Sequence, residues 1–357
     1  MAPDRGIEHT VTSSDVISQL GSLSLHKEPD LKQITPVTNT IVDLPESIPS
    51  HLSHDPATNA KRTNPFQFGQ RYLSESDDVF EYNAWDHVVP DKSHYEYCES
   101  QYAAQRASPV SDFDRARFNE HPEKWWDLFY KQKTSTFFKD RKWLVQEFPV
   151  LKEVTRNAAG KKVVLEVGAG AGNTAFPILR MNENPHLKLF AVDFSKKAVE
   201  TMRSAADYAH ANGVMAADVW DVAGVNLPPG VEEGSVDIVI MIFIFSALHP
   251  NQWQQAVTNI QRILKPGGEV LFRDYGRGDL AQVRFKAGRW MEGNFYVRGD
   301  GTRVYFFEKE ELEAIWGGPF GVLNLDVDRR LIVNRQRRIK MYRCWIQGRF
   351  RKKESRE

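Results

Sequence analysis

The pattern of hydrophobic and polar positions is most regular between residues 160 and 276. Short apolar runs rich in β-branched residues alternate there with longer stretches of helical periodicity. The apolar runs predict five strands, and their continuous hydrophobicity is typical of parallel strands buried on both faces. We expect these strands at residues 163–167, 187–192, 214–217, 236–244 and 269–274.

The stretches between these runs predict helices at residues 175–182, 195–211 and 251–264. Strands that alternate with helices predict a parallel sheet with crossover helices. The chain turns at Lys265-Pro266-Gly267-Gly268, because proline cannot continue the helix before it. A hairpin turn is expected at Asp300-Gly301 and a further helix near residues 309–316. Strand-like runs at 322–327 and 340–350 then suit an antiparallel hairpin at the sheet edge, so the fold class is α/β.

Two helices are expected before this core. One covers residues 95–107, and the other opens at His121-Pro122 and places Trp126 and Tyr130 on one face, four residues apart. Aromatic stripes at this spacing are usually core. Lysine and arginine residues nevertheless interleave with the rings here, and this mixture suits stacking on bases and pairing with phosphates. The helix is therefore either packing or a surface that contacts a cofactor or a nucleic acid.

A glycine-rich turn follows the first strand of the core, in the run VVLEVGAGAGNT. Gly168, Gly170 and Gly172 allow the backbone to take up positive φ values and to approach a ligand closely. The spacing differs from the dinucleotide fingerprint GxGxxG, and Glu166 would place negative charge near a pyrophosphate. A zwitterionic ligand without phosphate, such as S-adenosylmethionine, fits better. The alternative is an ordinary strand-to-helix turn.

Acidic side chains end the next two strands, at the edge where parallel sheets bind ligands. Asp193 ends the second strand, where a carboxylate can accept both hydroxyls of an adenosine ribose. Its alternative role is that of a carboxylate at a helix start, beside Ser195. Asp218 follows the third strand, and its side chain together with the Val219 amide could bind an adenine edge.

Charge is balanced overall but distributed unevenly. The formal net charge is +0 and the hydrophobic content is 41%, enough for a sizeable core. The first sixty residues hold 8 acidic and 3 basic residues, whereas residues 329–353 hold 11 basic residues and no acid. The basic segment predicts a polyanionic partner. Residues 1–62 are polar with few aromatics and are expected to form a disordered tail.

Cysteine usage and the N-terminus bear on compartment. Cys98 and Cys344 are far apart in the sequence, so we predict neither a disulfide framework nor a metal site. The N-terminus has no apolar signal-peptide core, and the longest apolar run, residues 236–248, contains Asp237 and is too short to cross a bilayer. These features predict a soluble cytoplasmic protein without membrane contact.

Several motifs together resemble a known family. The runs VVLEVGAGAGN and AVDFS, the KPGG turn and the late hairpin resemble the class I S-adenosylmethionine-dependent methyltransferases, with their seven-stranded Rossmann-like sheet. The runs WWDLFYKQ, FFKDRKWL, IFIFSALHP, LFRDYG and NFYVRGDGTRVYFF resemble the eukaryotic tRNA N3-cytidine methyltransferases, which modify cytidine 32 of the anticodon loop. The upstream run FGQRYLSESDDVFEYNAWDHV resembles the branch that acts on threonine tRNA.

The resemblance implies a division of the chain and a cofactor pocket for S-adenosylmethionine. Residues 63–155 would form an N-terminal extension that contacts tRNA and covers the cofactor, and residues 156–357 the methyltransferase domain with its basic end. Some members of the family need a helper protein, such as an aminoacyl-tRNA synthetase. The cofactor-binding residues carried over are Trp126, Tyr130, Gly168, Asp193, Asp218, Val219 and Ile242.

The chemistry implied is methyl transfer to an extruded cytosine. Positive charge moves from the sulfonium to the base, so a carboxylate near the base edge would stabilise the product cation. Asp274 is the predicted carboxylate, and Arg273 and Arg141 are predicted to position a phosphate or the cytosine carbonyl. Two other classes remain open: a methyltransferase-fold protein that binds RNA without catalysis, and a methyltransferase that acts on a protein or small molecule.

Overall fold

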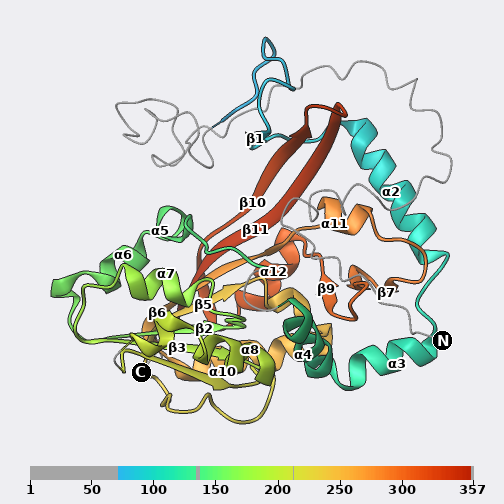
Figure 1. Ribbon diagram of the computed structural model, residues 1–357. Helices are drawn as coiled ribbons and strands as arrows, with labels where there is room; N and C mark the ends of the chain where they lie inside the picture. The colour runs from blue at the N-terminus through green and yellow to red at the C-terminus, as the bar shows by residue number, and fades with distance from the viewer. Residues whose placement is uncertain (1–70, 134–136, 212, 355–357) are drawn as a thin grey trace, which may run out of the picture. The chain divides into compact units, whose positions relative to one another are not determined.

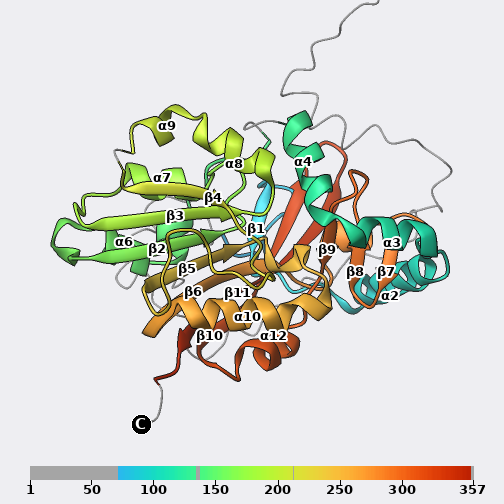
Figure 2. The same ribbon diagram turned by 90° about the horizontal axis from the view of Figure 1, so that it is seen from below.

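A sheet of eight strands runs through the part of the chain described by the computed structural model, which is residues 71–133, 137–211 and 213–354. The predicted tail, residues 1–62, lies outside the described residues. The strand order is β1-β10-β11-β6-β5-β2-β3-β4 (Figures 1 and 2). The strands are β1 (Ala84–Asp86), β2 (Lys162–Val167), β3 (Leu187–Asp193), β4 (Met215–Val219), β5 (Val236–Ile242), β6 (Leu264–Tyr275), β10 (Phe320–Asn334) and β11 (Ile339–Lys352).

The five predicted core strands form a parallel block, β6-β5-β2-β3-β4, which confirms the α/β prediction. Successive residues such as Val164 and Leu165 point to opposite faces of a strand, yet both are fully buried. Burial on both faces explains the continuous apolar runs in the sequence. The carboxyl ends of these strands therefore meet at one edge of the sheet.

Two helical layers cover the sheet. Apolar residues of α6 (Val150–Thr155), α7 (Ala175–Arg180) and α8 (Lys196–Arg203) pack in one cluster with one face. Those of α10 (Trp253–Ile263) and α12 (Lys309–Trp316) pack in another, and α6 and α7 lie on the opposite side of the sheet from α10 (Figure 1). The prediction of a single helix over 195–211 is wrong, because α8 ends at Arg203 and a separate short helix, α9 (Ala206–Ala209), follows.

The C-terminal hairpin is confirmed and is longer than predicted. Strands β10 and β11 pair antiparallel along their whole length, and β11 pairs antiparallel with β6. The sheet has eight strands and not the predicted seven, because a short strand, β1, pairs with β10 through Ala84↔Ile332. A three-residue strand is too short to show alternation in the sequence. Packing identifies it instead, because Trp85 is 2% exposed and lies against Leu331 and Val333.

Helices α2 (Lys92–Arg106), α3 (Asp112–Glu120) and α4 (Pro122–Lys133) and the strands β7 (Trp290–Glu292), β8 (Phe295–Val297) and β9 (Arg303–Tyr305) lie together at one end of the sheet (Figure 2). The helices predicted at 95–107 and after His121 are confirmed, and the Asp300-Gly301 turn joins two antiparallel strands. None of the helices formed by the described residues combines the length and apolar character needed to cross a bilayer. The remaining elements are α5 (Leu144–Glu147), η4 (Asn157–Ala159), η5 (Phe245–Ala247), η6 (Pro250–Gln252) and α11 (Leu280–Val283).

Candidate active site

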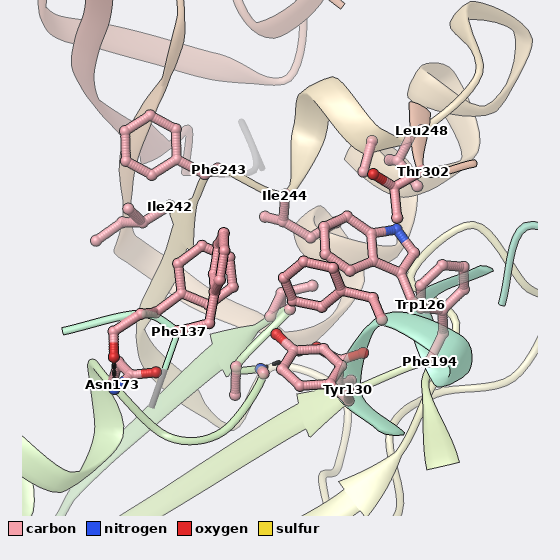
Figure 3. Close-up of a pocket in the computed structure, with 18 of the residues that line it drawn as sticks. Trp126, Tyr130, Phe137, Asn173, Phe194, Ile242, Phe243, Ile244, Leu248 and Thr302 are labelled. Atoms are coloured by element: carbon pink, nitrogen blue, oxygen red, sulfur yellow. Dashed lines mark hydrogen bonds between the residues drawn. The ribbon is translucent and has the colours of Figure 1, made fainter. Parts of the chain in front are cut away.

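A cavity of about 490 Å³ opens at the carboxyl ends of the parallel strands. One half of its wall comes from the glycine turn after β2, the end of β3, the segment after β4 and helix α4. The other half comes from the ends of β5 and β6, from the β8–β9 turn and from β11. Figure 3 shows Trp126 and Tyr130 of α4 facing Ile244 across this space.

The glycine turn is built for close approach. Gly168 and Gly170 have φ values of 67° and 58°, a region that side chains with a Cβ rarely adopt. A Cβ at Gly168 would lie 2.3 Å from Cγ1 of Ile244, and one at Gly170 would lie 2.2 Å from the Tyr130 hydroxyl oxygen. The turn therefore forms a cradle under α4 that tolerates no added atom.

Replacing Gly170 with alanine is expected to weaken binding of the predicted cofactor by about tenfold. The positive φ costs about 1–2 kcal/mol with a Cβ present, and Tyr130 must also move. Calorimetric titration with S-adenosylmethionine measures the effect. Gly234→Ala is the matched control, because Gly234 has a φ of 63° and nothing within 4 Å of its added Cβ. Equal affinities in the two variants would contradict a steric role for the Gly170–Tyr130 contact.

Asp193 lies at the floor of the cavity and is fixed by two backbone amides. Its Oδ2 accepts a hydrogen bond from the Gly170 amide and its Oδ1 one from the Ser195 amide, each at 2.9 Å. Burial raises the pKa of Asp193 to about 6, and these amides act in the opposite direction. Asp193 therefore faces the cavity, and it also holds the amide of Ser195, the residue whose side chain caps α8.

The aromatic stripe of α4 lies in the cavity wall. Trp126 and Tyr130 stack with ring centroids 6.2 Å apart, and burial raises the pKa of Tyr130 above its usual range. Asp127, between them, holds α4 against α8: its Oδ1 accepts from the Ser195 hydroxyl at 2.6 Å and the Lys197 amide at 3.0 Å. The rings of Trp126 and Tyr130 therefore lie over the glycine turn.

The assignment of Asp218 and Val219 to this wall is corrected. Strand β4 continues to Val219, two residues beyond its predicted end, so both residues lie within the strand. The Asp218 carboxylate pairs with Arg203 outside the cavity, and Val219 is 41% exposed. The segment that lines the cavity after β4 is Trp220, Asp221 and Val222. Ile242, at the end of β5, lines it as expected.

Arg141 lines the cavity beside a buried carboxylate. Its Nη1 lies 3.6 Å from Oε1 of Glu166, and its backbone amide donates to the Asn173 carbonyl at 3.0 Å. Burial raises the pKa of Glu166 to about 7 and lowers that of Arg141. Glu166 is 1% exposed and does not line the cavity. Because Glu166 lies on the other side of the guanidinium, an anionic group of a ligand can reach Arg141 only from the cavity.

The structure places Asp274 and Arg273 behind the cavity wall, which corrects their expected position facing the cleft. Asp274 is fully buried, and its two oxygens accept hydrogen bonds from the Ser246 and Tyr275 amides at 2.8 Å each. In a strand, neighbouring residues point to opposite faces, and Tyr275 is the one that reaches the cavity. Burial raises the pKa of Asp274 to about 6. Arg273 is 3% exposed and is covered by two tryptophans, Trp143 and Trp345.

The second half of the cavity combines aromatic rings with cations that motif reading did not identify. Phe243 and Tyr275 lie with ring centroids 4.9 Å apart, and the Arg298 guanidinium lies 5.7 Å from the Tyr275 ring. In the register of β11 with β6, Trp345 is directly opposite Tyr275, so both rings share one face. The available signals were the tyrosine in LFRDYG and the alternation in the basic C-terminal run.

The site's donor set suits an organic ligand. Among the described residues, no group of three or more His, Cys, Asp or Glu side chains is arranged to hold a metal ion. The first half offers carboxylates and backbone amides beneath aromatic rings, and the second offers rings beside guanidiniums. The cavity can therefore hold a zwitterionic nucleoside and a planar, electron-rich partner side by side.

Comparisons with known proteins agree with this geometry. A family model described as a methyltransferase domain matches residues 165–270. The chain is 49% identical over 285 residues to the tRNA N(3)-methylcytidine methyltransferase trm140 of Schizosaccharomyces pombe, covering 80% of this chain and 92% of that protein. It is 44% identical over 300 residues to the tRNA N(3)-methylcytidine methyltransferase Mettl2 of Drosophila melanogaster, covering 82% and 90%.

A third relative is a longer protein. The chain is 51% identical over 292 residues to the tRNA(Thr) (cytosine(32)-N(3))-methyltransferase of Saccharomyces cerevisiae. The match covers 81% of this chain and 46% of that protein, so this chain spans less than half the length of the yeast relative.

Proposed function

We propose that this chain, which belongs to the tRNA N3-methylcytidine methyltransferase family, transfers the methyl group of S-adenosylmethionine to N3 of cytidine 32 in threonine tRNA. The observation that carries the proposal is the single cavity that joins the glycine turn and Asp193 to an aromatic and cationic wall. One half suits the cofactor and the other suits a nucleobase.

The residues of the first half fit the cofactor. A Cβ at Gly168 or Gly170 would clash with Ile244 or Tyr130, so both glycines are needed for the shape of the turn. The fixed Asp193 carboxylate is suited to accept ribose hydroxyls. Asp221 and Val222 replace Asp218 and Val219 as the residues that would hold the adenine edge. Trp126 and Tyr130 would cover it. When bound, the cofactor supplies a methyl group on a sulfonium sulfur.

In this proposal Arg141 receives the cofactor's carboxylate and not an RNA phosphate. Its guanidinium lies next to the glycine turn, where it is held by Glu166, and it lines the first half of the cavity. A charge-assisted hydrogen bond of this kind contributes about 1.5–3 kcal/mol. The positioning of the RNA then falls to Arg298 in the second half of the cavity.

The second half would bind the extruded cytosine. Its N3 carries a lone pair, so the chain need not supply a general base, and its task is alignment of the base. The rings of Phe243, Tyr275 and Trp345 provide stacking surfaces, each stacked base contributing about 1–3 kcal/mol. Ring faces also stabilise a cation, so they suit the positive charge that forms on the base. Asp274, by holding the Ser246 and Tyr275 amides, would act as a positioning residue.

Fewer basic residues are available to contact tRNA than the composition suggests, because several of them pair with acidic side chains. Arg349 and Arg351 both pair with Glu269, at 2.6 and 2.7 Å, and Arg343 pairs with Asp279. These acids come from earlier segments, which is why the run of 11 basic residues appears unpaired in the sequence. The exposed cations Arg335, Arg337 and Arg338 at the β10–β11 turn are proposed to meet the tRNA backbone.

The cofactor affinity is expected to rise with pH around the pKa of Asp193. Burial raises that pKa to about 6, so the carboxyl is protonated at pH 5 and accepts ribose hydroxyls poorly. Affinity should therefore be about tenfold weaker at pH 5 than at pH 8, because one pH unit below the pKa leaves about a tenth of the group ionised. Titrations across this range measure the effect. Asp193→Asn should remove the pH dependence, and its persistence in that variant would assign it to another group.

The proposed function is tested by methyl transfer from labelled S-adenosylmethionine to total tRNA from cells lacking the modification, followed by nucleoside analysis. Labelled N3-methylcytidine is the expected product. Cofactor binding without labelled RNA, even with the cognate aminoacyl-tRNA synthetase added as helper, would favour a protein or small-molecule substrate. Absence of cofactor binding would favour an RNA-binding protein without catalysis.

The division of the chain and its compartment are part of the same proposal. The boundaries at residues 62 and 155 stay predictions, as does the cytoplasmic location. Cys98 and Cys344 are both free and buried, which is consistent with a reducing compartment.

A further inference from the structure

Two tryptophans in the cavity wall share a cation behind them. The Arg273 guanidinium lies 5.2 Å from the ring centroid of Trp143 and 5.0 Å from that of Trp345. Both rings line the cavity, whereas Arg273 is 3% exposed and does not. Arg273 therefore acts on the cavity only through the rings that it supports.

Arg273 is the end of a chain of buried charges. It donates to Asp328 of β10 and to Gln347 of β11. Asp328 lies 3.4 Å from Arg330, and Nε of Arg330 lies 3.2 Å from Oδ1 of Asp86 in β1. The side chains of Asp328, Arg330 and Asp86 are at most 14% exposed. The charges alternate in sign from β1 to the cavity wall.

The strand registers place this chain and the cavity wall on one face of the sheet. Asp86 is opposite Arg330, which is opposite Arg343. Asp328 is opposite Trp345, which is opposite Tyr275. Residues directly opposite each other in antiparallel strands point to the same face. Trp345 therefore lies between the charge chain and the ring of Tyr275.

Arginine side chains surround the Trp345 ring. Three guanidiniums lie 4.8–5.7 Å from its ring centroid, those of Arg343, Arg273 and Arg330. Burial raises the pKa of Asp328, but Arg273 and Arg330 lower it by more, so it stays ionised. Buried ion pairs are poor sources of net stability, and removal of one partner leaves an uncompensated charge. In some proteins such pairs serve instead to select a single geometry.

We propose that Asp86, Arg330, Asp328 and Arg273 form a positioning chain that holds the Trp345 indole as the stacking wall for the target base. The inference rests on the proposed function for the base itself. It assigns a task to β1, because this short N-terminal strand supplies the outermost charge of the chain. The upstream segment is then part of the active site through Trp345, without touching the substrate.

Asp328→Asn is the direct test, since it keeps the side-chain shape and removes the central negative charge. Turnover at saturating tRNA is expected to fall about tenfold, while the dissociation constant for S-adenosylmethionine stays within about twofold. Unchanged cofactor affinity shows that the variant is folded. Arg273→Lys, which keeps charge but loses the planar group between the two indoles, should lower turnover in the same way.

The matched control is Glu269→Gln. Glu269, in β6, is also a buried acid that pairs with two arginines of β11. It lies opposite Arg351, near the carboxyl end of β11 and away from the cavity. This variant should lose stability and keep normal turnover. Equal turnover losses in Asp328→Asn and Glu269→Gln would show that the chain acts through general stability, and would overturn the proposal.

A second readout does not depend on methyl transfer. The tryptophan emission and its quenching by acrylamide should change in Asp328→Asn, and most of that change should be lost in a Trp345→Phe background. Unchanged emission and quenching would overturn the positioning chain even if the wild-type protein proved inactive on tRNA. Wild-type inactivity with changed emission would overturn only the proposed function.

Discussion

Replacing Asp193 with alanine is expected to weaken S-adenosylmethionine binding by at least about 100-fold and to abolish methyl transfer at ordinary cofactor concentrations. The variant loses the acceptor for both ribose hydroxyls, each charge-assisted bond being worth about 1.5–3 kcal/mol. It also frees the Gly170 amide, which Asp193 holds at 2.9 Å. Calorimetric titration with the cofactor gives the affinity directly.

Asp218→Ala and Asp221→Ala are the informative controls for this experiment. Both residues are aspartates at or just after β4, but only Asp221 lines the cavity. Asp218→Ala should leave the affinity within about twofold, whereas Asp221→Ala should weaken it by about tenfold, the cost of one hydrogen bond. The reverse order would show that the adenine edge lies where the motif reading first placed it.

Tyr275→Ala is expected to reduce turnover by about 100-fold and to leave cofactor affinity within about threefold. The ring lies near both Phe243 and the Arg298 guanidinium, on the wall assigned to the base. Its loss removes about 1–3 kcal/mol of stacking and lets the base shift, and small misalignments are costly in such reactions. Single-turnover measurements at saturating tRNA separate this effect from weaker RNA binding.

Tyr275→Phe separates the ring from its hydroxyl. A stacking role requires that this variant keep most of the wild-type turnover. A loss as large as that of the alanine variant would instead assign the chemistry to the phenolic hydroxyl. Parallel loss of cofactor affinity in Tyr275→Ala would contradict the division of the cavity into two halves.

Local sequence was sufficient for the elements that carry the cofactor half. The apolar runs of β2, β3 and β5 are buried on both faces, and the glycines at 168 and 170 have the positive φ values that their spacing indicated. Trp126 and Tyr130 share a face because they are four residues apart on one helix. Each of these features depends on residues close together in the chain.

The features missed in the sequence depend on residues far apart. Asp274 and Arg273 lie at a strand end as expected, but Trp143 and Trp345, which cover Arg273, come from distant segments. The eighth strand is recognisable only when it pairs with β10. Three arginines of the basic run form ion pairs with Glu269 and Asp279, which come from earlier segments of the chain. Strand β4 ends two residues later than predicted, and the residues assigned to the adenine edge moved by three positions, to Asp221 and Val222.

The most direct test of the central claim maps the methyl group on purified threonine tRNA from cells lacking the modification. After incubation with the protein, labelled S-adenosylmethionine and, in a parallel sample, the cognate synthetase, the tRNA is cleaved and its fragments are analysed by mass. The account predicts one N3-methylcytidine, at cytidine 32, absent when that position is uridine and absent with Asp193→Ala. A methyl group at another position, or one retained when cytidine 32 is replaced, would contradict it.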